Sequence, residues 1–410
     1  MTGQDKKQEA PYVREERPSD APFTSEGGPV LRGKPVYLLG DRGGLGPDGV
    51  KELRRINDTH QPSGAQYATR KTLHAVQTQI ADRVKQRSAD QPKHGPDREF
   101  LDWAARRDAG PQLAGMDAVN GSGSNQFSAS GLQWMRDEPT LFDRRHLVIV
   151  DLRQEPHAHL GDWPATWIAE HDVKDHARLG ATPAAAQAAE EALVRDLLAR
   201  QTAGSGSVME WPVYYASDRN KKGRWPLWTP PAKPVKFSSI LTEADLVHGL
   251  IGPAGHHYLR LHAPDHEIPE RDAVVDTFVA AVMARPNAWF HFHCRGGKGR
   301  TTTFMCMYDA LRNADKQLDG FDVIYRQWMI GGSDLDSVQE KIREEGLDYH
   351  YKTRPARDRV QFVRKFVEYA TATAGATPWS VWAREHGCAL DDAAKHAQGD
   401  YAAAPRQAAE

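Results

Sequence analysis

The chain has 410 residues, enough to bury a large hydrophobic core in one large domain or two. Its formal net charge is -2 with 18 histidines counted as neutral, so bulk basic character does not predict a nucleic-acid partner. Its three cysteines, Cys294, Cys306 and Cys388, are too few for a disulfide framework and suit a reducing compartment.

The sequence shows no membrane or secretory signal. The first residues, 1–7, lack the apolar run of a signal peptide, and no run of about 18 apolar residues is present to span a bilayer. We therefore expect a cytoplasmic protein, or one exported by a route that needs no such signal.

The N-terminal quarter of the chain gives no functional signal. Residues 1–28 are charged, contain prolines and almost lack large apolar residues, so we expect a disordered tail. Residues 29–114 are polar with scattered helical periodicity, and we treat them as an extension of unknown role. Their Gly-rich run, 41–46, has the wrong spacing for a dinucleotide-binding loop and precedes a proline, which favours a surface turn.

The next elements indicate an α/β protein. Residues 147–153 form an apolar run with β-branched residues, which predicts a buried strand of the parallel type. Its carboxyl end carries charged side chains, and ligands bind at such ends in open α/β sheets; solvated charges at a strand end are the alternative. A helix is predicted at 183–201, followed by short strand-like runs and a basic cluster between 208 and 236.

Two loops are predicted to meet at one edge of the sheet. Residues 257–261 predict a strand, and Asp265 lies in the loop that follows it. An amphipathic helix and a second strand, 289–293, then lead to Cys294, which lies 294 − 265 = 29 residues after Asp265. That interval holds one helix and one strand, so the chain returns beside its starting strand and brings the two loops together.

The stretch after the second strand has the composition of a phosphate-binding loop. Cys294 is followed by five residues and then by Arg300, which opens a segment with a helical pattern. Glycines let a loop turn its N–H groups toward a tetrahedral dianion, and the N-terminus of the next helix adds a positive dipole end. The five residues are three glycines and two cations: Arg295, Gly296, Gly297, Lys298 and Gly299.

The same loop predicts a nucleophilic cysteine. Inward N–H groups and the helix dipole favour the thiolate of Cys294 over the thiol. Arg300 can hold two phosphate oxygens, Thr301 can donate its hydroxyl proton to the sulfur, and His293 can fix the loop from behind. A buried core cysteine beside a glycine turn is the alternative. A nucleotide-binding loop is disfavoured, because it would end in Gly-Lys-Ser or Gly-Lys-Thr.

The run from His293 to Thr301 resembles the signature loop of the cysteine-dependent protein tyrosine phosphatases. Further stretches narrow the resemblance to the protein-tyrosine-phosphatase-like inositol polyphosphatases, also called cysteine phytases. The resemblance extends over roughly 115–386 and rests on 115–127, 150–155 with His157, 265–266, 291–302, 324–327, 330–332 and 377–382.

This resemblance implies an α/β cysteine-phosphatase fold, with a central mixed sheet flanked by helices and a small β-rich inserted domain. The catalytic domain would cover 115–388 with the insertion around 160–240, and a flexible tail would follow at 389–410. The implied activity is the stepwise hydrolysis of myo-inositol hexakisphosphate through a phosphocysteine, with no cofactor and no metal ion. The expected partner is a small polyanion and not a nucleic acid, and the oligomeric state stays open.

The resemblance also implies the roles of three residues in the reaction. Cys294 resembles the nucleophile, Arg300 the phosphate clamp and Asp265 the general acid that protonates the leaving inositol oxygen. For Asp265, a carboxylate that caps the next helix is the alternative.

A second set of residues is expected to contact the substrate or the hydrolytic water. His266 and Asp172 match family positions near the bound inositol phosphate, and Gln327 is expected to orient the water. For His266 and Gln327 a purely structural role is an equal alternative. The expected cationic contacts outside the loop are Arg153, Lys221, Lys222, Lys352 and Arg354, each of which alone is more often a solvated charge.

The loop departs from the family pattern at two positions. Arg295 and Lys298 stand where the phytases have an acidic and an apolar residue, and cations there resemble the phosphoinositide lipid phosphatases. A lipid phosphatase, or a protein tyrosine or dual-specificity phosphatase, is therefore the first alternative. A catalytically dead phosphate-binding module is the second, against which the intact cysteine, arginine and aspartate argue. The third is that the region before residue 115 acts as a separable interaction arm.

Overall fold

A mixed sheet of five strands lies at the centre of the part of the chain that the structure describes. The structure is a computed structural model and describes residues 30–31, 34–40, 53–57, 67–108, 110–138, 146–169, 183–202, 239–337 and 353–391. In spatial order the strands are β3 (Arg54–Arg55), β4 (Gly121–Ser124), β10 (Trp289–His293), β5 (Leu147–Arg153) and β9 (Tyr258–Ala263).

The strands that carry the predicted motifs are neighbours in this sheet. β10 runs parallel to β4 and to β5, and β5 runs parallel to β9, whereas β3 is antiparallel to β4. The strand predicted at 147–153 is confirmed with these bounds, and the strand predicted in the aromatic run before Cys294 is confirmed as β10. The strand predicted at 257–261 begins one residue later and ends two residues later. Their carboxyl ends therefore lie at one edge of the sheet, as the sequence predicted.

The alternation of side chains along these strands fills two hydrophobic layers. Val150 and Phe292 belong to the larger core, while Ile149 and Trp289 belong to a smaller core. Because successive side chains of a strand point to opposite faces, β5 and β10 are buried on both faces. Helices therefore have to cover both sides of the sheet.

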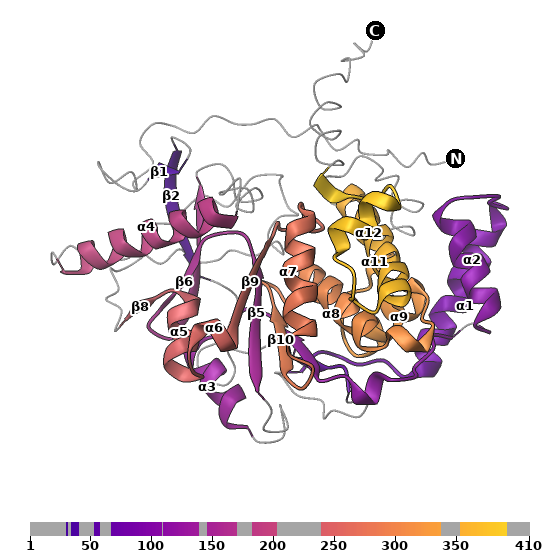
Figure 1. Ribbon diagram of the computed structural model, residues 1–410, viewed down its shortest axis with the longest axis horizontal. Coiled ribbons are helices and arrows are strands. Elements are labelled where there is room, and N and C mark those ends of the chain that lie inside the picture. The colour runs from indigo at the N-terminus through magenta and orange to yellow at the C-terminus, as the bar shows by residue number, and fades with distance from the viewer. Residues whose placement is uncertain are drawn as a thin grey trace, which may run out of the picture.

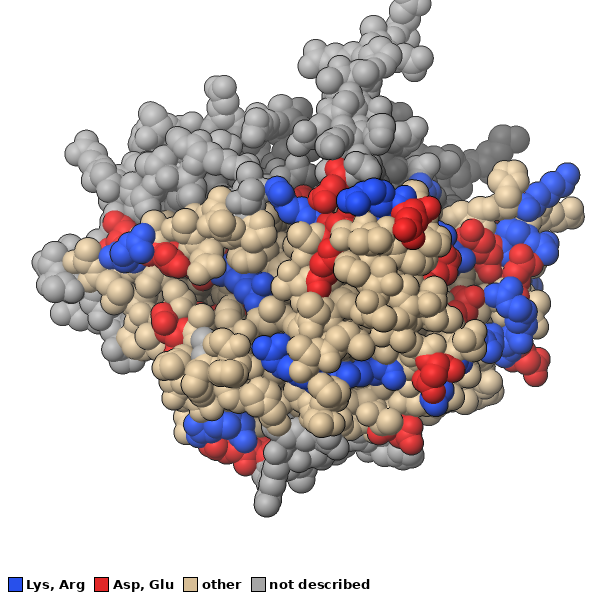
Figure 2. Space-filling model, viewed as in Figure 1, with Lys and Arg blue, Asp and Glu red and all other residues tan. Residues whose placement is uncertain are grey.

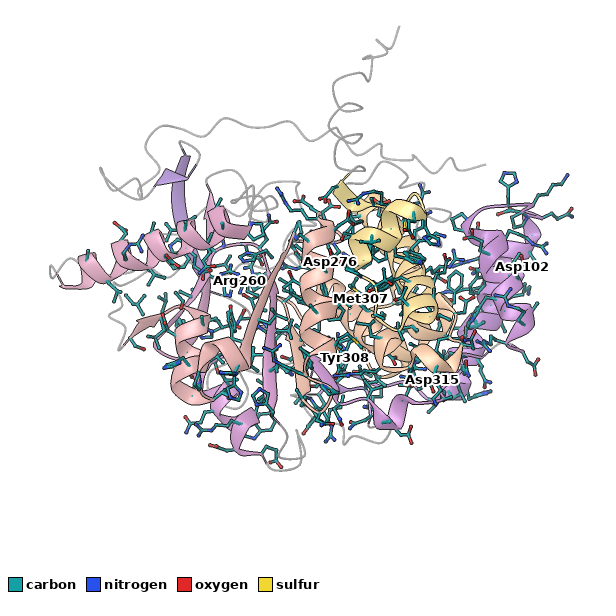
Figure 3. All side chains as sticks on the ribbon, viewed as in Figure 1. Asp102, Arg260, Asp276, Met307, Tyr308 and Asp315 are labelled. Atoms are coloured by element: carbon teal, nitrogen blue, oxygen red, sulfur yellow. The ribbon has the colours of Figure 1, made fainter. Side chains whose placement is uncertain are left out.

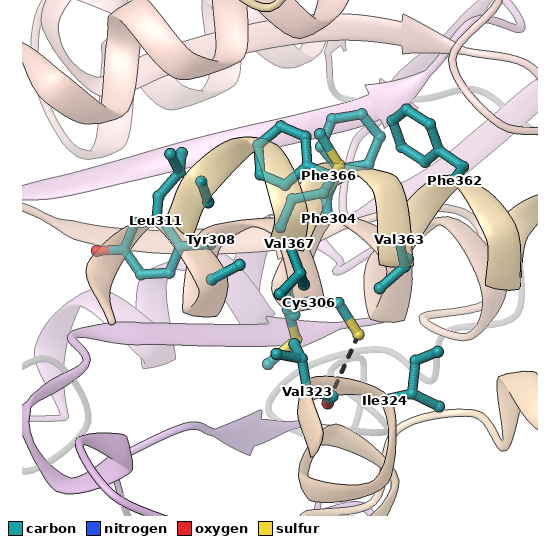
Figure 4. Packing of buried hydrophobic residues seen from close by; sticks show 14 of the residues in the cluster. Phe304, Cys306, Tyr308, Leu311, Val323, Ile324, Phe362, Val363, Phe366 and Val367 are labelled. Carbon is teal, nitrogen blue, oxygen red and sulfur yellow. Dashed lines mark hydrogen bonds between the residues drawn. The ribbon is translucent and has the colours of Figure 1, made fainter. Parts of the chain in front are cut away.

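The larger core is covered by helices from the C-terminal half, which Figure 1 shows side by side in orange and yellow. They are α7 (Asp272–Met283), α8 (Gly299–Arg312), α9 (Gly320–Met329), α11 (Thr353–Thr373) and α12 (Trp379–Glu385). Figure 4 shows Phe304 and Cys306 of α8 among side chains of α9 and α11. Cys306 is fully buried, its thiol donates to the carbonyl oxygen of Val323, and burial raises its pKa well above the ordinary value. Cys306 is thus a core cysteine.

The opposite face of the sheet is covered by a second group of helices. These are α3 (Ala129–Asp137), α5 (Glu243–Leu250) and α6 (Ala254–His257). Leu132 and Met135 of α3 join Leu246 and Val247 of α5 in the smaller core. The first residue of α5, Glu243, is a charged residue that is buried completely.

A second, antiparallel sheet stands beside the first (Figure 1). Its strands, in spatial order, are β1 (Val30–Leu31), β2 (Lys34–Gly40), β7 (Trp163–Ala169), β6 (His157–Leu160) and β8 (Ile240–Leu241). Helix α4 (Pro183–Thr202) packs on it, and Leu193 shares a core with Leu160 and Trp167. This sheet lies where a β-rich insertion was expected, but it also takes two strands from the stretch assigned to an N-terminal extension.

Two further helices from that stretch pack on the main core: α1 (Leu73–Ala89) and α2 (Pro96–Arg106). The ring of Trp103 in α2 stacks on Tyr325 of α9, with centroids 5.1 Å apart. Its Nε1 donates to Asp322 Oδ1 at 3.1 Å. Residues 73–106 therefore belong to the same hydrophobic core as the phosphatase-like segment. The tail expected at 1–28 lies outside the described residues.

Within the described residues, short 3-10 turns connect these elements at Met116–Ala118, Ala314–Lys316 and Leu335–Ser337. Figure 2 shows positive and negative side chains interspersed at the end of the molecule formed by α1 and α2, in keeping with the net charge near zero. Among the helices that the structure describes, none has both the length and the apolar composition needed to cross a membrane.

The packing of α2 predicts that Trp103 is essential to the stability of the core. Trp103→Ala removes a fully buried ring and should lower the free energy of unfolding by about 3–5 kcal/mol. Trp103→Phe keeps most of the ring and loses the hydrogen bond, which should cost about 1 kcal/mol. Urea unfolding of both variants checks this. A loss below about 1 kcal/mol for the alanine variant would show that α2 is a detachable arm.

Candidate active site

Residues 294–298 form a loop that joins β10 to α8 at the carboxyl edge of the first sheet. Cys294 lies at its base with 4 % of its surface exposed. The hydroxyl of Thr301, in the first turn of α8, donates to Cys294 Sγ at 3.2 Å. The residue before α8, Lys298, makes no side-chain capping bond, so the N–H groups of the first turn face the loop's opening uncapped by a side chain.

The loop is held closely against the neighbouring strand. Gly297 has a φ of +68°, and a Cβ built there would lie 2.4 Å from the backbone nitrogen of Asn125. Only glycine fits this position, because both its conformation and its surroundings exclude a side chain. Arg54 of β3 donates to the carbonyl oxygen of Gly297 at 2.8 Å and to Thr302 Oγ1 at 3.2 Å. The short strand before residue 115 therefore fixes the loop's shape.

The guanidinium of Arg300 is held by a bidentate ion pair. Its Nη1 and Nη2 donate to the two carboxylate oxygens of Glu155 at 2.7 and 2.9 Å, and Nη1 also donates to the carbonyl oxygen of Ala263 at 3.0 Å. Burial alone would lower the pKa of Arg300, but Glu155 and Asp265 raise it well above its ordinary value. Arg300 is thus a permanent cation in a fixed orientation beside Cys294.

The loop after β9 brings Asp265 to the same place. Asp265 Oδ1 lies 3.3 Å from Arg300 Nη2, and its side chain is 22 % exposed. His266 has a φ of +65°, a strained value for a residue with a side chain, and its N–H donates to Asp265 Oδ1 at 3.1 Å. The structure therefore brings the two predicted loops together, with the carboxyl group open to solvent on one side.

A second buried guanidinium reaches the loop from α11. Arg359 Nη2 donates to the carbonyl oxygen of His266 at 2.6 Å, and a Cβ at Gly299 would lie 3.1 Å from its Nη1. Burial lowers the pKa of Arg359, an effect that the charges of Asp265 and Cys294 oppose. Arg359 was not predicted, because nothing in the sequence of its helix distinguishes it from the other cations there.

Gln327 lies on α9, fully buried behind the loop. Its Nε2 donates to Asp309 Oδ2 at 2.9 Å, which fixes the orientation of the amide. Its Oε1 is buried without a hydrogen-bond partner among the described residues. An unsatisfied buried oxygen of this kind is suited to accept from a water molecule.

The remaining expected contacts fall into three groups. Around the loop, Arg295 is half-buried, while Gly296 and Lys298 are exposed. Arg153 is a correction: it is fully buried and donates to Glu155, Gln126 and Thr166, so it supports the site from behind and does not face a substrate. Asp172, Lys221, Lys222 and Lys352 lie outside the described residues, and Arg354 lies in α11 with a side chain that is not described.

Sequence reasoning missed three residues that organise the site: Glu155, Arg54 and Arg359. Glu155 was visible only as one of several charges at the end of a strand. No local signal could have paired it with the clamp, because Arg300 is 145 residues away in the chain. Arg54 had no such signal, because its partner Gly297 is 243 residues away in the chain.

A chain of hydrogen bonds runs through His291 beneath the loop. Trp289 Nε1 donates to Ser122 Oγ at 2.8 Å, and Ser122 Oγ lies 2.9 Å from His291 Nδ1. His291 Nε2 lies 3.0 Å from Ser124 Oγ, which donates to the carbonyl oxygen of Asn125 at 2.7 Å. With one proton at each step, the chain requires a neutral His291 protonated on Nε2. Burial accordingly lowers its pKa to about 3.

This buried histidine makes stability depend on pH. The unfolded chain protonates His291 below a pH of about 6.5, whereas the folded protein does so only near pH 3. Between these values the free energy of unfolding must fall as the pH falls, by about 1.4 kcal/mol per pH unit for this group at the limit. His291→Gln should reduce the slope of the unfolding free energy against pH by the contribution of at most one bound proton. Urea titrations between pH 4.5 and 7 measure it, and an unchanged slope contradicts this account.

The geometry can be compared with proteins of known family. Residues 150–312 match a family model for PTP-like phytases. The description of that family names inositol hexakisphosphate. Effector protein hopD2 of Pseudomonas syringae pv. tomato is 25% identical over 284 residues, 68% of this chain and 54% of that protein. The uncharacterized protein AvrBs1.1 of Xanthomonas campestris pv. campestris is 38% identical over 98 residues, 22% of this chain and 85% of that protein.

Solved structures of PTP-like phytases are also similar to this chain. The PTP-like myo-inositol phosphatase of Mitsuokella multacida, in complex with myo-inositol-(1,3,4,5)-tetrakisphosphate, is similar with a TM-score of 0.59 at 25% identity. The match covers 88% of this chain and 50% of that chain, as does the match to the tandemly repeated phytase of the same organism, with a TM-score of 0.58. The chain spans about half the length of hopD2 and of the Mitsuokella protein.

These matches, together with the loop and its clamp, identify the class of protein. Residues 150–312 match the family of protein-tyrosine-phosphatase-like phytases, and the chain shares the α/β fold of the solved Mitsuokella structures, with a central mixed sheet flanked by helices.

Proposed function

We propose that the protein is a cysteine-dependent phosphatase that hydrolyses myo-inositol hexakisphosphate and lower inositol polyphosphates in steps. One observation carries the proposal. The thiol of Cys294 lies at the base of a glycine-rich loop, and the clamped Arg300 holds Asp265 within 3.3 Å of its guanidinium. A nucleophile, a fixed cation and a proton donor thus converge at one edge of the sheet.

The first step transfers the phosphoryl group to sulfur. The Cys294 thiolate attacks phosphorus in line, an S–P bond forms, and the bond from phosphorus to the inositol oxygen breaks. Arg300 and the loop N–H groups stabilise the charge that builds on the equatorial oxygens. Asp265, protonated at this stage, gives its proton to the leaving oxygen.

The second step returns the enzyme to its starting state. Water attacks the phosphorus of the phosphocysteine, Asp265 takes a proton from that water, and the S–P bond breaks. Inorganic phosphate leaves and the thiolate is regenerated. In this proposal Gln327 orients the water through its Oε1, which has no hydrogen-bond partner among the described residues.

Three features support a polyanionic substrate. The family is described by inositol hexakisphosphate, and the similar Mitsuokella structure holds an inositol tetrakisphosphate. Cations also surround the loop in this chain: the exposed Lys298, the half-buried Arg295 and the buried Arg359. A substrate with several phosphates would meet positive charge beyond the reacting phosphate.

The name of hopD2 supports one of the two expected locations. It is called an effector protein, which favours export into a host cell over residence in the cytoplasm. A translocation reporter fused to the chain separates the two, because a signal inside host cells requires export and its absence contradicts this part of the proposal.

The substrate class is tested by a panel of phosphate esters. We expect the fastest phosphate release from inositol hexakisphosphate, with slower release from a phosphotyrosine peptide and from phosphoinositide vesicles. Cys294→Ser should abolish release from all three, because serine is a far weaker nucleophile in this loop. Release by that variant at the wild-type rate would contradict the covalent mechanism.

The panel also tests a second candidate. Arg295 and Lys298 in the loop favour a phosphoinositide headgroup, so faster release from vesicles than from the soluble hexakisphosphate would assign the protein as a lipid phosphatase. Arg295→Glu is the matched variant, since it restores the acidic character of the phytase loop. It should leave activity on the hexakisphosphate if the phytase assignment holds, and remove activity on vesicles if the lipid assignment holds.

A further inference from the structure

A buried carboxylate sits behind the nucleophile loop at the junction of the two sheets. Glu243, the first residue of α5, lies two residues after the end of β8 of the second sheet and is fully buried. Its Oε1 lies 2.6 Å from His293 Nε2, and its Oε2 lies 3.3 Å from His157 Nε2. Gln126 Nε2 donates to Oε2 at 2.7 Å. Glu243 is thus the meeting point of a histidine from each sheet.

Charged residues extend this contact across the junction. Nε2 of His157 in β6 lies 3.3 Å from Asp151 Oδ2 of β5. The backbone N–H of His157 donates to Glu190 Oε2 of α4 at 2.9 Å. Arg260 of β9, labelled in Figure 3, pairs with Glu190 at 2.7 Å and with Asp151 at 3.2 Å. Groups from the first sheet and from the second sheet therefore neutralise one another in the interior.

The charge states of these groups follow from their neighbours. Burial alone would raise the pKa of Glu243, but His293 and the histidines of β6 lower it well below its ordinary value. Burial and Arg153 lower the pKa of His157, but Asp151 and Glu190 raise it, and the outcome is about 10. Removing one member of such a set leaves its partner charged and unpaired in the interior, which is strongly unfavourable.

We propose that Glu243 is a positioning residue that acts on the nucleophile through His293, and that the second sheet exists in part to deliver it. The proposal rests on the proposed function for its kinetic consequences. His293 is the last residue of β10 and is bonded directly to Cys294. The His293 ring lies between Glu243 and Phe127, and the ring centroids of Phe127 and His293 are 4.8 Å apart. Fixing that ring fixes the point at which the loop leaves the strand.

Glu243 does not face the opening of the loop, and the groups that meet the phosphate are Arg300 and the loop amides. A positioning residue should therefore change the rate of the chemical step and leave substrate binding unchanged. Loss of the carboxylate should also loosen the loop relative to the rest of the core, because the helices behind it keep their own contacts.

The kinetic test compares Glu243→Gln with Asp245→Asn. Both remove one negative charge from the first turn of α5, but Asp245 is exposed, and among the described residues its carboxylate accepts a hydrogen bond from its capping partner Thr242. With para-nitrophenyl phosphate as substrate, we expect kcat to fall at least tenfold in Glu243→Gln with KM within twofold of wild type. Asp245→Asn should match the wild type in both. A rise in KM at unchanged kcat, or wild-type kinetics of Glu243→Gln, overturns the proposal.

A double-mutant comparison identifies the route of the effect. If Glu243 acts through His293, the double variant Glu243→Gln, His293→Asn should lose no more activity than the worse single variant. If the losses multiply, the two residues act independently and the proposal fails.

Hydrogen exchange tests the same claim without any substrate. In Glu243→Gln, exchange of peptide amides in 294–300 should speed up at least fivefold, with α9 and α11 unchanged. Unchanged exchange in the loop, or faster exchange throughout the core, overturns the proposal. If every variant and the wild type lack phosphatase activity, the proposed function has failed and this measurement still decides the positioning role.

Purified wild-type protein offers one further check. Asp151, Glu243 and His293 present oxygen and nitrogen atoms within 4.8 Å of one another, which is a spacing that a metal ion could use. One equivalent of a divalent metal, measured by elemental analysis, would show that these side chains are ligands and would overturn the positioning role. The charge balance described above predicts a content below one tenth of an equivalent.

Discussion

The site depends on the bidentate pair between Arg300 and Glu155. The side chain of Arg300 is 2 % exposed, and burying its charge without a carboxylate partner would strongly destabilise the fold. A single hydrogen bond would leave the guanidinium free to rotate. The two parallel hydrogen bonds set the plane of the guanidinium and leave its remaining edge for Asp265 and the reacting phosphate. Because Glu155 lies two residues after the end of β5, the sheet itself determines the position of the clamp.

Two sets of buried polar side chains lie in the same part of the core, and they have different effects on the protein. On one side, His291 and its neighbouring hydroxyls form a neutral, one-directional chain that anchors the end of β4 under the loop. On the other side, Glu243, His157 and Arg260 form a charged set that joins the two sheets. The neutral chain costs stability in acid, whereas the charged set ties the second sheet to the nucleophile.

Local sequence predicted the parts of the site that are built from neighbouring residues. The loop after Cys294, the strands at 147–153 and 289–293, and the meeting of the Asp265 loop with the cysteine loop all follow from spacing and composition. Glu155, Arg54, Glu243 and Arg359 could not be read in this way, because their partners are distant in the chain; Glu155 and Arg300 are 145 residues apart. Arg153 misled because a charged residue at a strand end can be turned inward by partners that only the fold supplies.

The central claim is that the sulfur of Cys294 carries the phosphoryl group during turnover. Rapid acid quench during hydrolysis of inositol hexakisphosphate, followed by peptide mass spectrometry, tests it most directly. The account predicts a phosphoryl adduct on the peptide that contains Cys294, which appears within the first turnover and disappears as substrate is exhausted. Turnover with no adduct on that peptide, or with an adduct on a different residue, would contradict it.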